Sequence, residues 1–407
     1  MSGPLGAAPR TSRGSSSHGR PFARRVFGGS VHWARIDYPV LAVAALLLCI
    51  GVLFIGAMAE VDVRLDRSDP VRIESHLQKL LVTAPLIALG IWIRPRWLRR
   101  NAVWLYGAAM ILLALVPIVG EERNSARRWI PTPVFDLQPS ELAKLALVLV
   151  LARVLYRSRM KRASEWVAPT LLTLLPMGMV AAQPDLGTAL TIVPVALGMF
   201  YLAGARGRVL AAVVGGVLVL GVAAWKLEWV QEYQLRRIDT WAAALDPAHL
   251  IEDRNGDAFH LYHAQVAIGD GGVFGTGLGR GIASRAGHLP ERESDSVFAV
   301  IAAEGGFLGA TALVVLYTLL VGLLISSAGQ IRERFSRLVV GGIGLYFAAH
   351  FFINTGVNLG LLPMTGLTLP LLSTGGSSLL VTFLALGLAV GLAAHAEPSL
   401  DEDAFRA

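Results

Sequence analysis

Ten stretches of the chain are apolar over about the length that crosses a lipid bilayer, and short polar segments separate them. Apolar runs of roughly 20 residues match the hydrocarbon thickness of a bilayer. The pattern therefore predicts an all-α polytopic membrane protein, with one membrane domain over residues 37–396. The ten expected transmembrane helices cover residues 38–58, 76–93, 102–119, 139–156, 166–182, 186–204, 207–226, 296–325, 338–360 and 376–395.

The composition supports this interpretation. Hydrophobic residues make up 54% of the 407 residues and charged residues only 16%, whereas a soluble globular protein carries about 25% charged residues. A soluble enzyme and a disordered chain are both excluded, because only a bilayer accommodates this much apolar surface.

Charged residues are divided unequally between the two sides of the predicted membrane domain. With the N-terminus in the cytoplasm, the inner segments hold 21 basic residues, and the outer segments 59–75, 120–141 and 227–295 hold 12 basic and 20 acidic residues. Lys and Arg favour cytoplasmic loops, and an even number of spans then places both termini in the cytoplasm. The net charge of +7 reflects the inner arginines, so no nucleic-acid partner is expected.

Three segments lie outside the expected spans. Residues 1–36 are rich in Gly, Ser, Pro and Arg, which predicts a disordered basic tail that can touch anionic lipid, and residues 397–407 form a short acidic tail. Residues 227–295, between the seventh and eighth helices, form a long extracytoplasmic loop. Apolar residues such as Trp241 and Tyr262 favour an ordered loop that carries a functional surface.

Charged side chains within or beside apolar spans are costly in a membrane and are therefore functional candidates. The two lysines near span ends, Lys79 and Lys226, are interpreted as side chains that extend to the interface and are not site candidates. The full set is Lys79, Glu141, Lys144, Asp185, Lys226, Asp295 and Glu304.

Glu141 and Lys144 lie three residues apart behind Pro139, so they project from one face of the first turns of a helix. Two interpretations are open. The residues form a satisfied ion pair within the helix, or they line a polar cavity in which Lys144 meets a diphosphate and Glu141 orients it.

Three other features each allow a structural and a functional interpretation. Asp185 can cap the following helix or face a ligand. The glycine-rich segment 269–281 matches neither the Walker nor the dinucleotide pattern, and it is either a cradle for an anion or a plain connector. Asp257, His260 and His263 have helical spacing that could hold a metal ion, although solvated loop histidines are favoured.

Asp295 ends the long loop and begins the eighth span, where water, lipid headgroups and apolar side chains meet. Such surroundings raise the pKa of a carboxyl group and suit it to accept a proton from an attacking hydroxyl. The alternative is a helix cap. Glu304 lies nine residues further along the helix, about 13.5 Å deeper, too far to form a carboxylate pair with Asp295.

With these residues the chain resembles the SEDS family of peptidoglycan glycosyltransferases, the RodA and FtsW type, from about residue 38 to 395. Six motifs in the same order carry the resemblance. They are Arg127-Arg128-Trp129-Ile130; Gln138-Pro139-Ser140-Glu141 with Lys144; Gln183-Pro184-Asp185-Leu186-Gly187-Thr188; Ala267-Ile268-Gly269 with Gly271-Gly272; Leu289-Pro290-Glu291 with Asp295; and Gly360-Leu361-Leu362-Pro363 with Pro370 and Ser373 to Ser378.

The resemblance implies an enzyme that polymerises lipid II into β-1,4-linked glycan at the outer face of the bacterial cytoplasmic membrane, for elongation or division. Asp295 would be the base on the acceptor 4-hydroxyl, and undecaprenyl diphosphate would leave with inversion. A divalent cation (Mg²⁺ or Mn²⁺), but no organic cofactor, and a class B penicillin-binding protein as partner are also implied. The substrate-binding residues implied by the motifs are Gln138, Glu141, Lys144, Arg127, Arg128, Asp185 and Ser377.

Several positions depart from the family pattern, and they affect the expected acceptor contacts. Ser296 stands after Asp295 where the family usually has Phe, and His263-Ala264 stand where it has Gln-Ser. Thr276 replaces a basic or amide residue, and Thr374 replaces an aromatic residue. The stretch 366–370 and the basic N-terminal tail lean towards the division type.

Two other functions are compatible with an apolar chain of this kind. A flippase for the same lipid-linked precursor would also bury charged residues, but no inverted repeat is visible and the polar residues gather on the outer side. A scaffold that only recruits a wall enzyme would leave Asp295 without a role.

Overall fold

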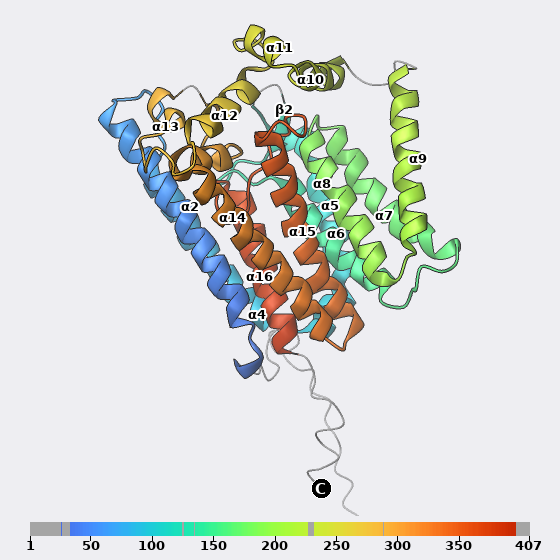
Figure 1. Ribbon diagram of the computed structural model, residues 1–407. Coiled ribbons are helices and arrows are strands. Elements are labelled where there is room, and N and C mark those ends of the chain that lie inside the picture. Colours follow the sequence, from blue (N-terminus) through green and yellow to red (C-terminus); the bar gives the residue numbers. More distant parts are fainter. Residues whose placement is uncertain are drawn as a thin grey trace, which may run out of the picture.

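The computed structural model describes Val26 and residues 33–123, 126–133, 135–226, 232–287 and 289–395. Most of the predicted basic tail 1–36, the acidic tail 397–407 and the side chain of Lys226 lie outside the described residues. The described chain is a bundle of long helices that run roughly parallel to one another (Figure 1).

Each of the ten predicted apolar segments is helical. Within the described part of the chain, five helices are long and apolar enough to cross a membrane: α2, α5, α14, α15 and α16. The helices of the bundle are α2 (Tyr38–Arg64), α3 (Ile73–Thr83), α4 (Pro85–Trp92), α5 (Pro95–Val119), α6 (Pro139–Leu155), α7 (Ser164–Ala181), α8 (Leu186–Ala203), α9 (Gly207–Lys226), α14 (Val297–Gln330), α15 (Arg334–Asn358) and α16 (Gly376–Ala394).

The helices α6, α15 and α16 form the buried centre of the bundle, and nearly every residue of α6 and α16 is buried. Large apolar side chains on α2, α5 and α14 are exposed instead, for example Leu53, Trp104 and Phe307. In a membrane protein such side chains face the acyl chains of the lipid. Polar residues that lie on α6 and α15 are therefore shielded from lipid by the outer helices.

Two predicted spans are interrupted, each for a local reason. The segment 76–93 divides into α3 and α4 at Ala84, because Pro85 lacks a backbone N–H and starts a new helix. Within α14, Gly306 adopts a φ of 67°, which glycine tolerates best. There, the N–H groups of Phe307 and Leu308 donate to the carbonyls of Gly272 and Val273 in the long loop.

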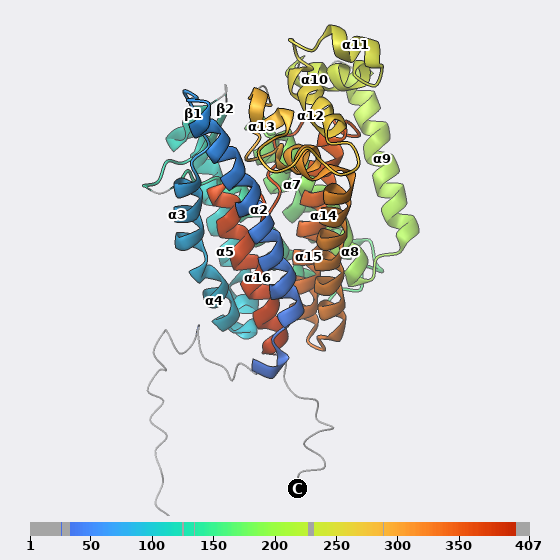
Figure 2. The ribbon, with the colours of Figure 1, turned by 60° about the vertical axis from the view of Figure 1, so that its left-hand side comes forward.

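Short elements gather at one end of the bundle, which we call the loop end (Figures 1 and 2). They are β1 (Glu121–Arg123), β2 (Ala126–Trp129), α10 (Glu232–Ala243), α11 (Pro247–Glu252), α12 (Phe259–Asp270) and α13 (Ile282–Ala286). The short helix η1 (Trp33–Arg35) precedes α2 at the opposite end.

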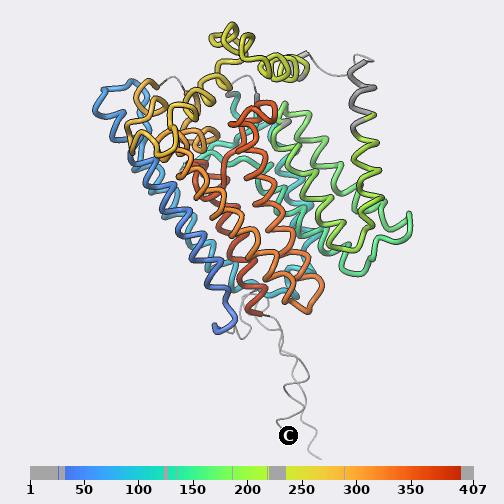
Figure 3. The backbone as a smooth tube through the Cα atoms, viewed as in Figure 1, coloured from blue at the N-terminus to red at the C-terminus, as the bar shows by residue number. Residues whose placement is uncertain are grey.

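The described part of the long loop contains four helices, α10 to α13, which are joined by turns. Trp241 of α10 donates through Nε1 to the Gly360 carbonyl at 2.9 Å, which attaches α10 to the segment between α15 and α16. The backbone trace shows α2 running beside α14 from the loop end to the opposite end (Figure 3). The loop end therefore joins elements from the whole length of the chain.

Candidate active site

Asp295 lies at the loop end, two residues before α14 begins, and its side chain is half-buried. The segment 359–375, between α15 and α16, passes close to its carboxylate. Gly366 in that segment has a φ of 66°, a conformation that favours glycine, and a side-chain carbon added there would lie 3.6 Å from Asp295 Oδ2. The carboxylate is therefore enclosed on one side by backbone.

These surroundings change the acidity of Asp295. Burial raises the pKa of its carboxyl to about 8, and the negative charges of Glu291 and Glu293 act in the same direction. Burial also raises the pKa of Glu293. A carboxylate with a pKa near neutrality can take a proton from a hydroxyl and release it again. The shift agrees with the expectation from the sequence.

Two asparagines of α15 fix the backbone of Asp295. Asn354 and Asn358 donate through Nδ2 to the Asp295 carbonyl oxygen at 2.8 and 3.0 Å, and both asparagines are buried. Two bonds on one carbonyl restrict the position of the peptide group, and with it the direction of the side chain.

The segment between α15 and α16 fixes the residues just before Asp295. Ser373 Oγ donates to the Ser294 carbonyl, and Thr374 donates to the Glu293 carbonyl from its N–H at 3.0 Å and its hydroxyl at 3.2 Å. The departure from the family pattern at Thr374 thus supplies an anchor of its own.

The partly buried His260 of α12 and the buried Ser296 form a pair beside Asp295, with 2.5 Å between Nε2 and Oγ. A serine at a helix N-cap usually accepts a hydrogen bond from the first turn, but Ser296 makes none. Burial, followed by the charge of His263, lowers the pKa of His260 to about 4, so its imidazole is neutral near pH 7. The departure at Ser296 is therefore matched by a hydrogen-bond partner.

A second cluster, which we call the Asp62 clamp, holds the segment that carries Asp295. The fully buried Asp62 carboxylate accepts hydrogen bonds from Arg292 Nη2, from Arg67 Nη1 at 2.6 Å and from the Val71 N–H at 2.8 Å. Arg292 also donates to the Ser284 carbonyl at 3.2 Å.

This clamp was not predicted from the sequence, because Asp62 falls in the predicted outer segment 59–75. The helix α2 continues to Arg64 and buries Asp62 at its end. Since Arg292 lies 230 residues further along the chain, neither periodicity nor spacing could pair the two residues.

We expect Asp62→Asn to lower the stability of the protein by about 3–5 kcal/mol, because the buried guanidinium of Arg292 would lose its counter-charge. Glu60→Gln in the same helix is the matched control. Glu60 pairs with Arg64 at 2.5 Å, but both side chains are mostly exposed, so the pair contributes at most about 1 kcal/mol. Melting curves in detergent measure both effects, and equal melting temperatures for the two variants would contradict the prediction.

The glycine-rich segment 269–281 packs against α14, and α14 already occupies its amides. The N–H of Gly277 donates to the Glu304 carbonyl at 3.0 Å, and the N–H of Gly279 to the Glu304 carboxylate at 2.9 Å. Ser284 Oγ donates to the second carboxylate oxygen. These contacts favour a connector over a cradle for an anion, and they give Glu304 a structural partner in the loop.

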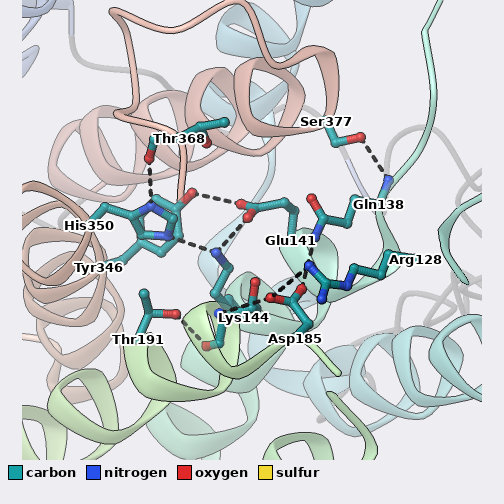
Figure 4. A network of polar contacts seen from close by, with 11 residues as sticks. Arg128, Gln138, Glu141, Lys144, Asp185, Thr191, Tyr346, His350, Thr368 and Ser377 are labelled. Atoms are coloured by element: carbon teal, nitrogen blue, oxygen red, sulfur yellow. Dashed lines mark hydrogen bonds and ion pairs between the residues drawn. The ribbon is translucent and has the colours of Figure 1, made fainter. Parts of the chain in front are cut away.

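Glu141 and Lys144 of α6 form a buried ion pair, with 2.6 Å between Oε1 and Nζ (Figure 4). Two residues of α15 complete the cluster. Tyr346 donates its hydroxyl to Glu141 Oε2 at 3.2 Å, and His350 Nε2 lies 2.7 Å from Lys144 Nζ. Among the described residues the Lys144 ammonium therefore has two acceptors for its three N–H groups.

Asp185 is the helix cap that the sequence allowed, and it also bonds to a neighbouring side chain. Its Oδ1 caps α8 by accepting from the Thr188 N–H at 3.2 Å, and its Oδ2 accepts from Gln138 Nε2 at 3.1 Å. Arg128 Nη1 lies 3.8 Å from Asp185 Oδ1, and Arg128 donates to the Gln183 and Pro184 carbonyls. Figure 4 shows Arg128, Gln138 and Asp185 beside the Lys144 cluster.

Ser377 and Arg127 differ in how far their side chains are buried. Ser377 is buried at the start of α16, where its Oγ accepts from the Gln138 N–H at 2.8 Å and donates to the Asp136 carbonyl at 2.6 Å. Arg127 is half-exposed and lies 3.5 Å from Glu122 across the β1–β2 hairpin. Successive residues of a strand point to opposite faces, so Arg127 points away from the network that Arg128 joins.

Lys79 corrects one interpretation from the sequence. The sequence predicted a side chain that only extends to the interface, but its ammonium donates to the Thr374 carbonyl at 3.3 Å. The nearby opposite charges that act on it are Glu293 and Asp136. His350 and Tyr346 were also not predicted, because only Asp, Glu and Lys were treated as costly residues within spans. A histidine in the middle of an apolar span was the available signal.

The described residues do not supply a protein-only metal site. No group of three His, Cys, Asp or Glu residues in this part of the chain is arranged to hold an ion. The candidate triad of Asp257, His260 and His263 is replaced by separate contacts, since His260 bonds to Ser296 and His263 stacks edge-on with Phe259 and Tyr262.

The fold and the site define the class of this chain. It is a helical, multi-pass membrane protein with an enclosed carboxylate at its loop end and a buried ion pair beneath it. The model of the cell cycle protein family FtsW/RodA/SpoVE matches residues 38–397. The chain belongs to this family.

Curated relatives named FtsW and MrdB match this chain at similar identity. A probable peptidoglycan glycosyltransferase FtsW of Burkholderia thailandensis is 31% identical over 94% of this chain and 85% of the relative. The peptidoglycan glycosyltransferase MrdB of Escherichia coli K12 is also 31% identical, over 91% of this chain and 96% of the relative.

Two solved structures share the fold. One belongs to a study of polymerization and crosslinking by a peptidoglycan synthase complex; it has a TM-score of 0.76 and 31% identity, and the match covers 89% of this chain and 98% of that one. The other is the rod shape determining protein RodA of Thermus thermophilus, with a TM-score of 0.66 and 29% identity over 90% of this chain and 99% of that chain.

Proposed function

We propose that this chain is a peptidoglycan glycosyltransferase that polymerises lipid II into β-1,4-linked glycan strands. The observation that carries the proposal is Asp295, a half-buried carboxylate with a raised pKa at the loop end. It lies in a chain of the FtsW/RodA/SpoVE family whose curated relatives are named peptidoglycan glycosyltransferases.

In the proposed reaction Asp295 is the general base. It takes the proton of the acceptor 4-hydroxyl while that oxygen forms a bond to the anomeric carbon of the donor sugar. The bond from this carbon to the diphosphate oxygen breaks, and its electron pair leaves with undecaprenyl diphosphate, so the linkage inverts from α to β. A diphosphate is stable as an anion and needs electrostatic rather than acid assistance.

The cationic side chains near the site are proposed to supply this assistance. Lys144 can offer its third N–H to a phosphate oxygen when substrate opens the cluster, while Glu141 orients it. Arg127 is exposed and can bind the diphosphate directly.

The other substrate-binding residues implied by the motifs are proposed to shape the wall of the binding site. They already bond to one another or to nearby backbone, and they are Gln138, Arg128, Asp185 and Ser377.

Further parts of the proposal concern membrane, ion and partner. We place all ten helical segments across the bacterial cytoplasmic membrane, with both termini in the cytoplasm and the loop end outside, because this satisfies the charge pattern. A divalent cation remains a prediction, and no step of the reaction is derived through it. A class B penicillin-binding protein is the proposed partner, supported by the likeness to a peptidoglycan synthase complex.

The purified protein, alone and with a cognate class B penicillin-binding protein, should convert lipid II in detergent into long glycan strands that separate on a gel. A detergent micelle lacks the two leaflets between which a flippase moves lipid, and a scaffold has no catalytic site. Neither would therefore yield polymer under these conditions. Unreacted lipid II in a preparation that is folded and supplied with Mg²⁺ and partner would overturn the proposed function.

A further inference from the structure

Three polar residues lie one helical turn apart on one face of α15: His350, Asn354 and Asn358. The i, i+4, i+8 spacing places their side chains in a row along the helix. All three are buried, with at most 2% of their surface exposed. Burial of a row of polar groups is costly unless each group has a partner, so the contacts of the row indicate what it holds.

At the deep end of the row, His350 joins two elements through its two ring nitrogens. Nδ1 lies 3.2 Å from the Thr368 carbonyl oxygen, and Nε2 lies 2.7 Å from Lys144 Nζ (Figure 4). A carbonyl only accepts, so Nδ1 carries the proton, and Nε2 must then accept from the ammonium. His350 is therefore a neutral imidazole with a fixed tautomer.

At the other end, the two asparagines join the same segment to Asp295. Asn354 donates through Nδ2 to the Leu367 carbonyl at 2.6 Å and to the Asp295 carbonyl at 2.8 Å. Asn358 donates to the Asp295 carbonyl at 3.0 Å and to the Asn354 carbonyl at 2.9 Å. Leu367 and Thr368 are neighbours, so His350 and Asn354 hold consecutive carbonyls of the segment that encloses the Asp295 carboxylate.

We propose that His350 is a positioning residue that fixes the Lys144 ammonium and the segment over Asp295 in one geometry, so that the cation and the base face the substrate together. The inference rests on the proposed function, because it assigns the two charges to one reaction. The row on α15 then acts only by positioning other groups, since none of the three side chains needs to touch substrate.

The proposal makes the hydrogen-bonding pattern of the side chain at position 350 decisive, rather than its bulk. In His350→Leu, Lys144 loses one acceptor and the Thr368 carbonyl loses its donor. In His350→Gln, one amide N–H and one amide oxygen can replace the two ring nitrogens at similar reach, whereas His350→Asn carries the same groups on a shorter side chain. His249→Gln, at a solvent-exposed histidine of α11, is the matched control.

The experiment measures kcat and KM for lipid II polymerisation with each variant in the complex that is active for wild type, normalised to the folded fraction from gel filtration. We expect His350→Leu and His350→Asn to lower kcat by roughly 10- to 100-fold, since a displacement of about 1 Å can cost that much. His350→Gln should restore kcat to within a few-fold of wild type, and His249→Gln should match wild type.

The outcomes separate this inference from the proposed function. Absence of polymer from wild type overturns the function itself. If wild type is active, a folded His350→Leu with wild-type kcat overturns the positioning role, and so does a His350→Gln that is as slow as His350→Leu. Loss of folding in the leucine variant leaves the glutamine and asparagine pair to decide, because both keep a polar side chain.

Discussion

Asp295→Asn should reduce polymerisation of lipid II by roughly 10²–10⁴-fold, the usual contribution of a general base. The amide has nearly the shape of the carboxyl group, and the bonds of Asn354 and Asn358 to the backbone carbonyl at this position do not depend on the side chain. Only the capacity to accept a proton is lost. Gel separation of glycan strands over a long time course measures the residual rate.

The wild-type enzyme should also become faster as the pH rises through about 8. With a pKa of about 8, the Asp295 carboxyl is protonated and inactive at low pH, and only about a tenth of it is ionised at pH 7. The kcat/KM profile reports this ionisation in the free enzyme. Because the negative charge of Glu291 helps to raise this pKa, Glu291→Gln should move the rising limb to lower pH.

Two results would exclude Asp295 as the base. One is an Asp295→Asn enzyme that makes polymer at the wild-type rate. The other is a wild-type profile that stays flat between about pH 6 and 9 in the same detergent, since a base with a raised pKa must titrate within that window.

The sequence predicted those features that depend on neighbours in the chain. Apolar runs located the helical segments, because a helix that faces lipid must be apolar over its length. Asp295 was found because a carboxylate at the boundary between a polar loop and an apolar span is costly. The Glu141–Lys144 pair was found because residues three apart share a helix face, and the structure brings them to 2.6 Å.

Features that depend on the packing of distant segments could not be predicted in this way. His350 lies 206 residues from Lys144, and Arg292 lies 230 residues from Asp62. A single sequence contains no spacing rule for such pairs. The amides of the glycine-rich segment looked available for an anion, and only the kink at Gly306 shows that α14 already binds that backbone. The packing of segments that are distant in the sequence, rather than local pattern, decides these contacts.

The buried ion pair allows a test that separates its structural role from a role in catalysis. Lys144→Met should destabilise the protein by about 3–5 kcal/mol, because Glu141 would remain buried without its counter-charge. The double variant Glu141→Gln with Lys144→Met removes both charges and keeps the side-chain volumes similar. Its melting temperature should return close to that of wild type, since replacing a whole buried pair is often nearly neutral.

Catalysis should not return with stability if Lys144 assists the departure of the diphosphate. The folded double variant should then polymerise lipid II roughly 10²–10³-fold more slowly than wild type, the usual cost of losing one electrostatic stabiliser of a developing negative charge. A double variant that regains the wild-type rate together with the wild-type melting temperature would restrict Glu141 and Lys144 to holding α6 against α15. The leaving group would then depend on other cations, such as Arg127 and Lys79.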